Sequence, residues 1–116
     1  MRRELRLRRP QDFQRLRREG RVYRRPGLLL SIAPNDLSHN RYGIIVGKRI
    51  GNAVQRNRLR RQLRAVLTTF HPQLEPGLDM VWIVQKPLKG QPYPVIVRTV
   101  NDLLLQAGLV DGTVIP

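Results

Sequence analysis

The densest group of side chains able to do chemistry is a basic run in the middle of the chain. Residues 48–64 contain seven basic side chains and no acidic one. The basic residues, with the asparagine that lies among them, are Lys48, Arg49, Arg56, Asn57, Arg58, Arg60, Arg61 and Arg64. On a helix, Arg56, Arg60 and Arg64 would repeat every four residues and repel one another. A phosphate backbone would turn each of these penalties into a charge-assisted hydrogen bond. The run therefore predicts a surface for nucleic acid, whereas an ordinary solvated helix face would interleave acids with its bases.

Other residue types offer less chemistry. The chain has no cysteine, which excludes disulfides, thiolate zinc sites and a cysteine nucleophile. His39 and His71 have no serine or acidic partner at a recognisable spacing, so we interpret them as surface residues. The aspartates are scattered singly, which argues against a two-metal nuclease site. Trp82 lies in an apolar run and is expected in the core, while Tyr42 and Tyr93 stay open.

Charge distribution supports a polyanionic partner. Lys and Arg total 22 against 8 acids, and 19 of these bases fall in residues 1–64 with only 4 acids. Because 19 of the 22 are arginines, whose planar group pairs with phosphate and stacks on bases, folded RNA is favoured. Solubility alone would not require such clustering. A membrane-binding cationic peptide fits poorly, because the basic run lies inside a patterned globular chain.

The elements that must position the basic run follow from periodicity and turn residues. A short amphipathic helix is predicted over residues 10–19, opened by Pro10 and ended by Gly20. After a brief extended piece at residues 22–23, strands over 28–33 and 41–48 are expected to pair as an antiparallel hairpin. A strand over 80–85 and a helix over 93–106 complete the pattern. The chain should be one α+β domain.

The helix that carries most of the basic run is predicted over residues 53–70. Asn52 and Gln55 have the spacing of a capping box at its start. At about 100° per residue, one buried stripe contains Leu59, Leu63, Val66 and Phe70. The residues pointing away from this stripe are Asn57, Arg60, Arg61 and Arg64, with Arg56 and Arg58 at its flanks. The geometry predicts a helix with one face in the core and one face of arginines.

Domain limits follow from composition. Residues 1–9 are rich in arginine and are expected to form a mobile basic arm, residues 10–109 the single RNA-binding domain, and residues 110–116 a C-terminal tail. No window approaches the length of about 20 apolar residues needed to cross a bilayer. We expect a soluble, cytoplasmic protein with no membrane association.

The run from Lys48 to Arg64, with Arg56-Asn57-Arg58 at its centre, resembles the signature of the bacterial ribonuclease P protein component. Asp12-Phe13-Gln14 and the strand spacing before the signature extend the resemblance over residues 6–109. The resemblance implies an α-β sandwich with about four strands, three helices and a left-handed β-α-β crossover. It also implies a part in an endoribonuclease whose catalysis resides in an RNA subunit that uses magnesium (Mg2+), with no catalytic residue in the protein.

The family's binding roles can be carried to matching residues. Arg56, Asn57, Arg58, Arg60, Arg61 and Arg64 would face the ribonuclease P RNA and help to organise metal near the cleavage site. The 5′ leader of precursor tRNA would lie in a cleft that includes Phe13, Arg17, Leu29 and Ser31. Arg17 and Ser31 stand where the family often has aromatics, which predicts weaker stacking on the leader.

Some assignments stay open at this point. Lys48 and Arg49 would bind either leader phosphate or the RNA subunit. No protein partner is implied. The alternative function is that of a structural RNA-binding protein or RNA chaperone, such as a ribosomal protein, which would share the charge and the arginine content but not the ordered signature.

Overall fold

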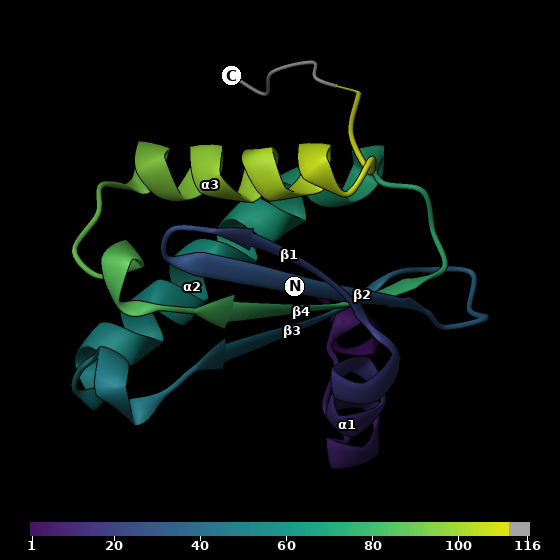
Figure 1. Ribbon diagram of the computed structural model, residues 1–116, viewed down its shortest axis with the longest axis horizontal. Helices are drawn as coiled ribbons and strands as arrows, with labels where there is room; N and C mark the ends of the chain where they lie inside the picture. The colour runs from purple at the N-terminus through teal and green to yellow at the C-terminus, as the bar shows by residue number, and fades with distance from the viewer. Residues whose placement is uncertain (112–116) are drawn as a thin grey trace.

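The structure is a computed structural model that describes residues 1–111. It contains one mixed four-stranded sheet and three α-helices (Figure 1). The strands are β1 (Arg21–Arg25), β2 (Leu28–Pro34), β3 (Arg41–Val46) and β4 (Leu78–Val84), and the helices are α1 (Pro10–Glu19), α2 (Ala53–Phe70) and α3 (Tyr93–Gln106). Short 3-10 turns are η1 (Arg3–Leu5), η2 (Lys48–Ile50), η3 (His71–Gln73) and η4 (Lys86–Leu88). The predicted α+β class and all three predicted helices are confirmed.

The predicted pairing of the sheet is wrong in one respect. The strands at residues 28–33 and 41–48 do not form a hairpin, because the sheet order is β1-β2-β4-β3. β2 pairs antiparallel with both β1 and β4, and β3 pairs parallel with β4. β4 is buried along most of its length on both faces, which favours a central place for it. Helix α2 then links the parallel neighbours β3 and β4 as a β-α-β unit.

Strand limits also differ from the prediction. β3 ends at Val46, because Lys48–Ile50 turns into η2 before α2 begins. β4 begins at Leu78, two residues earlier than its apolar run suggested. The earlier start places Asp79 inside the sheet, opposite Arg41 of β3.

The two faces of the sheet are covered very unequally. α2 and α3 lie on one face and α1 on the other (Figure 1). The cluster under α2 and α3 has 19 buried residues, including Trp82 as predicted. The cluster on the α1 face has four, namely Leu7, Leu16, Ala33 and Val81. Most of the hydrophobic stabilisation therefore comes from the α2 and α3 side, and the α1 face keeps part of the sheet open.

The N-terminal segment is not a free arm along its whole length. Arg6 forms a parallel bridge with Tyr42 of β3, and the backbone N–H of Leu7 donates to the Tyr42 carbonyl at 2.8 Å. Leu7 is buried under α1. The expectation of a mobile arm fails here because β3 is an edge strand with unpaired backbone groups and Leu7 has an apolar site to fill. In the expected tail, residues 112–116 lie outside the described residues.

Within residues 1–111, none of the helices combines the length and the apolar character needed to cross a membrane.

Candidate RNA interface

The start of α2 is fixed by the predicted capping box. The Asn52 side chain accepts a hydrogen bond from the Gln55 backbone N–H at 2.9 Å, and Gln55 Oε1 accepts one from the Asn52 backbone N–H at 3.0 Å. A Cβ at Gly51 would lie 2.1 Å from Gln55 Oε1, so only glycine leaves room for this arrangement. The chain therefore turns sharply from η2 into a helix whose first turns carry the arginines.

The buried stripe of α2 matches the prediction, whereas Arg60 and Arg64, predicted to point away from it, are less exposed than expected. Leu59, Leu63, Val66 and Phe70 are all buried, and Leu67 joins them. Asn57, Arg58 and Arg61 are exposed, while Arg56, Arg60 and Arg64 are half-buried. We call Arg56, Arg58, Arg60, Arg61 and Arg64 the arginine face. The buried stripe anchors the helix, so this face is presented on a rigid element.

Hydrogen bonds hold two members of the arginine face in place. Arg56 Nε donates to the Gly51 carbonyl at 3.2 Å. Arg60 donates through Nη1 to Asn57 Oδ1 at 3.0 Å and through Nη2 to the Val46 carbonyl at 3.4 Å. These acceptors are neutral, so the bonds orient the guanidinium groups without neutralising them.

The arginine face concentrates positive charge. Burial lowers the pKa of Arg64, and the neighbouring charges of Arg6 and Arg60 lower it further. The ion pairs found among residues 1–111 include none of the arginines of this face. Arg6 was missed by sequence reasoning, because only docking of the N-terminal segment on β3 brings it near α2.

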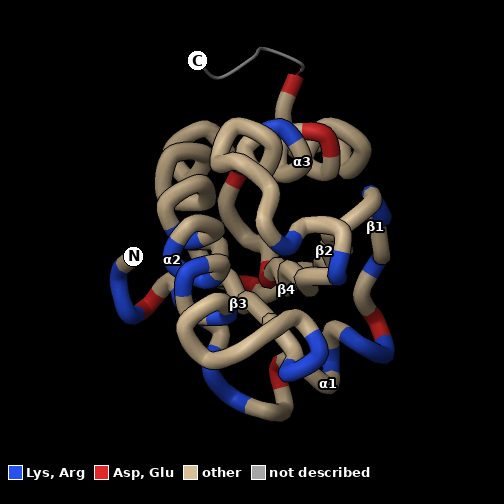
Figure 2. The backbone as a smooth tube through the Cα atoms, turned by 90° about the vertical axis from the view of Figure 1, so that its left-hand side faces the viewer, with Lys and Arg blue, Asp and Glu red and all other residues tan. Residues whose placement is uncertain are grey.

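Most of the basic residues lie away from α3. Figure 2 shows blue segments along the N-terminal stretch, α1, β1 and the start of α2, whereas α3 is almost free of them. A field of this shape attracts a polyanion to the α1 and α2 side and leaves the α3 side nearly neutral.

A cleft lies between α1 and the open part of the sheet. Its volume is about 190 Å³. The lining residues come from α1 and all four strands: Phe13, Leu16, Arg17, Val22, Arg24, Leu29, Ser31, Ile45, Val81 and Ile83. We call this hollow the α1 cleft. The four residues predicted for a leader-binding cleft, Phe13, Arg17, Leu29 and Ser31, are thus brought together in one hollow.

Two of these residues also hold α1 in place. A Cβ on Gly43 of β3 would lie 2.7 Å from Phe13 Cε1. The half-buried Phe13 ring therefore packs directly against the backbone of Gly43, which has no side chain to keep the ring away. The Ser31 hydroxyl donates to the Leu16 carbonyl at 3.2 Å and is buried. Phe13 therefore combines packing with a place at the cleft, and Ser31 serves mainly to attach α1 to β2.

Lys48 and Arg49 lie on η2 rather than on the arginine face. Both are exposed and line a second hollow of about 640 Å³ together with Lys86 of η4. Ile45 and Ile83 line this hollow as well as the α1 cleft, so the two hollows adjoin each other. Lys86 was not predicted, because its proximity depends on the parallel pairing of β3 with β4.

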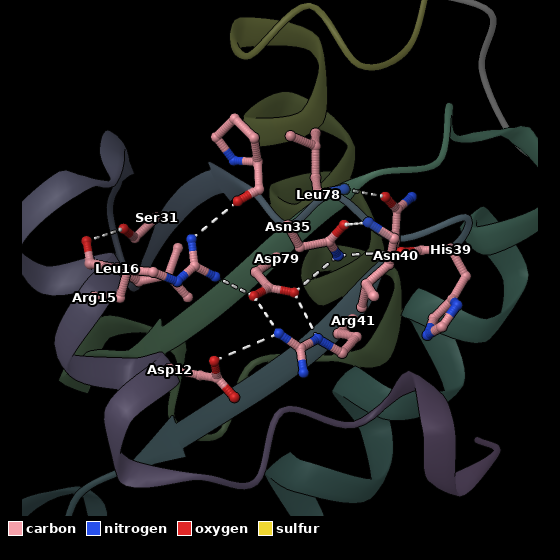
Figure 3. Close-up of polar contacts among 12 residues, drawn as sticks. Asp12, Arg15, Leu16, Ser31, Asn35, His39, Asn40, Arg41, Leu78 and Asp79 are labelled. Atoms are coloured by element: carbon pink, nitrogen blue, oxygen red, sulfur yellow. Dashed lines mark hydrogen bonds and ion pairs between the residues drawn. The ribbon is translucent and has the colours of Figure 1, made fainter.

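The aspartates are less scattered than their sequence positions indicated. Asp79 is fully buried and accepts hydrogen bonds from Arg41 Nε at 2.8 Å and Nη2 at 2.7 Å (Figure 3). It also accepts from Arg15 of α1, and Arg41 lies 3.5 Å from Asp12. The hydrogen bond to Asp79 raises the pKa of Arg41 despite its partial burial. The Asp79 carboxylate is thus already surrounded by guanidinium groups.

The histidines have structural contacts. His71 Nδ1 and the Tyr42 hydroxyl share a hydrogen bond at 2.7 Å, and His39 Nε2 lies 3.2 Å from the Glu4 carbonyl oxygen. Tyr42, which the sequence left open, belongs to the core, and burial raises its pKa to about 12. Tyr93 is exposed at the start of α3.

Comparison with known proteins identifies the family. The Ribonuclease P family model matches residues 1–108. The ribonuclease P protein component of Roseiflexus castenholzii is 44% identical over 115 residues, covering 98% of this chain and 94% of that protein. The Synechocystis protein of the same name is 39% identical, covering 92% of this chain and 88% of that protein.

Solved structures agree with the sequence relatives. The RNase P protein of Staphylococcus aureus has a TM-score of 0.86 and 26% identity, covering 92% of this chain and 98% of that chain. The RNase P protein from Thermotoga maritima has a TM-score of 0.81 and 25% identity, with the same coverage. With the signature helix, the four-stranded sheet and these relatives in agreement, the chain belongs to the ribonuclease P protein family.

Proposed function

We propose that this subunit binds the catalytic RNA of ribonuclease P through the arginine face of α2 and holds the 5′ leader of precursor tRNA in the α1 cleft. The observation that carries the proposal is the arginine face itself. It lies on a rigid, capped helix, its charges are not neutralised by carboxylates of residues 1–111, and Arg6 adds to it. The arginines of this face repel one another, and this repulsion is relieved when each guanidinium group binds a phosphate.

The roles of the protein and of the RNA subunit are assigned from the side chains that the arginine face offers. The arginine face offers donors and positive charge but no general base or nucleophile, so hydrolysis is assigned to the RNA subunit with Mg2+. The Mg2+ ligands would be mainly RNA oxygens. Arginines that neutralise phosphates reduce the repulsion between RNA segments, and the holoenzyme should then need less magnesium.

The leader contact depends on the shape of the α1 cleft. Its floor is apolar, formed by side chains such as Leu29 and Ile83, and Arg17 and Arg24 stand among its lining residues. A base stacked on Phe13 would contribute about 1–3 kcal/mol. Phe13 is the single aromatic side chain lining the cleft, so stacking should be limited to one base.

Lys48 and Arg49 are assigned to leader phosphate rather than to the RNA subunit. They line the hollow that adjoins the α1 cleft at Ile45 and Ile83, and Lys86 lines the same hollow. A strand of RNA leaving the cleft in this direction would keep its backbone beside three cations.

The proposal is tested by multiple-turnover cleavage of a precursor tRNA at low Mg2+. Three reactions are compared: the protein alone, a bacterial ribonuclease P RNA alone, and both together. Cleavage at the mature 5′ end only when both are present supports the proposal. Cleavage by the protein alone would make it a nuclease itself, and tight RNA binding without stimulation would indicate a structural RNA-binding protein or chaperone.

A further inference from the structure

We propose that Asp79 is a positioning residue for leader binding, because its buried carboxylate fixes α1 over the sheet and so sets the shape of the α1 cleft. This inference rests on the proposed function of the cleft. It concerns a residue of β4 that lines neither hollow.

Helix α1 needs such an attachment because its other anchors are few. It has 10 residues, and isolated helices shorter than about 12 residues are marginal in water. Leu16 is its one buried residue, and the apolar cluster on this face has four buried members against 19 on the other face. The position of α1 therefore depends strongly on polar contacts.

Asp79 gathers these polar contacts from three parts of the chain (Figure 3). Arg15 of α1 donates to Asp79 Oδ2 and, through Nη1, to the Pro34 carbonyl at 2.9 Å. Arg41 donates two hydrogen bonds to the same carboxylate, and Asn35 Nδ2 donates a further one at 3.0 Å. One carboxylate thus connects α1, β3 and the connection that follows β2.

A second contact ties α1 to the same network. Asp12 lies one turn before Arg15 and pairs with Arg41 at 3.5 Å. Two carboxylates and two guanidinium groups therefore form a balanced cluster, in which Asp79 is fully buried and the Arg15 and Arg41 side chains are 25% and 23% exposed. Because the cluster is shielded from solvent, its ion pairs are screened less than those on the surface.

The link to the cleft is geometric. Phe13 and Arg17, which line the cleft, lie two residues before and two residues after Arg15 in α1. Arg15 itself is not a lining residue. Holding Arg15 against the sheet fixes the rotation of α1, and with it the direction of both cleft side chains.

The test compares precursor tRNA that carries its leader with mature tRNA that lacks one. Holoenzymes are reconstituted with ribonuclease P RNA and either the unaltered protein, Arg15→Met, Asp79→Asn or the control Arg25→Met, and dissociation constants are measured for both tRNAs. Arg25→Met removes the same charge as Arg15→Met and also breaks an ion pair, Arg25 with Asp102 at 3.1 Å, but that pair joins β1 to α3.

The unaltered protein should bind the tRNA with a leader more tightly. We expect Arg15→Met and Asp79→Asn each to reduce this preference by about fivefold or more, the lower end of one lost base stack. Arg25→Met should leave the preference unchanged. Asp79→Asn distinguishes a positioning role from a general effect of charge. Removing a negative charge would strengthen RNA binding if electrostatic attraction alone determined the affinity.

Hydrogen exchange of the α1 amides supplies a second readout that needs no RNA. Exchange in α1 should become faster in Arg15→Met while exchange in α2 stays unchanged. If Asp79→Asn fails to fold, Arg15→Met still decides the question, because it leaves the Arg41 contacts with Asp79 intact. A preserved preference in a folded Arg15→Met protein refutes the positioning role alone. Equal binding of both tRNAs by the unaltered protein refutes leader binding in the α1 cleft, and it then also refutes the positioning role of Asp79.

Discussion

Replacing Arg60 and Arg64 together by Ala should weaken binding to ribonuclease P RNA while leaving the fold intact. Both side chains belong to the arginine face and both are half-buried on a helix anchored by its opposite stripe. If each contacts one phosphate, the slope of log affinity against log salt should fall by about 1.5 in total, since each contact contributes about 0.7–0.9.

The loss of affinity can be set against the loss of stability. A hydrogen bond to a charged group contributes about 1.5–3 kcal/mol, so two lost phosphate contacts weaken binding by about 3–6 kcal/mol at low salt. The folded protein loses the Arg60 bonds to Asn57 and to the Val46 carbonyl, the second of which is long at 3.4 Å. Relief of the repulsion among Arg56, Arg60 and Arg64 offsets part of that loss. The net change in unfolding free energy should stay within about 1 kcal/mol, or about 5 °C in Tm.

The assay is binding of labelled ribonuclease P RNA by filter retention over a range of KCl concentrations, with thermal unfolding followed by circular dichroism. The matched control is Arg21→Ala with Arg98→Ala, which removes two exposed charges from β1 and α3. This control should lower affinity slightly through net charge but change the salt slope less than the first pair. An unchanged slope in the Arg60 and Arg64 variant would show that the arginine face does not meet the RNA. Unfolding of that variant would show that the two residues are structural.

Three further predictions concern the fold around the interface. Tyr42→Phe should abolish a loss of stability at high pH, because burial raises the pKa of Tyr42 to about 12 from an unfolded value near 10. The unfolding free energy of the unaltered protein should fall by about 2 kcal/mol between pH 10 and pH 12, and urea unfolding with Tyr93→Phe as control measures the difference. Leu63→Ala, at a fully buried position of α2, should cost about 2–5 kcal/mol in urea unfolding, and a cost below 1 kcal/mol would contradict the assigned stripe. Gly43→Ala should displace the Phe13 ring, which lies 2.7 Å from the new Cβ, and should weaken binding of leader-bearing tRNA more than binding of the RNA subunit. Equal effects on both binding reactions would show that Phe13 does not contact the leader.

Local features of the chain were predictable because short-range rules control them. The capping box at Asn52 and Gln55 and the buried stripe of α2 depend on residues three or four apart, and both are confirmed. The limits of α1 follow from Pro10 at its first turn and Gly20 at its end. The arginine face follows from the same helical geometry, so its members were identified before any contact was known.

Sheet order and the attachment of α1 were decided only by the tertiary structure. Adjacent strands in sequence favour a hairpin, but β4 inserts between β2 and β3 because its residues need burial on both faces. Asp79 is a single residue whose contacts could not be predicted from the sequence either. Its partners Arg41 and Arg15 are 38 and 64 positions away, and no local pattern marks such a contact. The sequence by itself therefore determined the helices, the arginine face and the family, since these depend on spacing along the chain. The cleft and the network that holds it depend on which distant segments share a surface, and burial of the whole chain decides that.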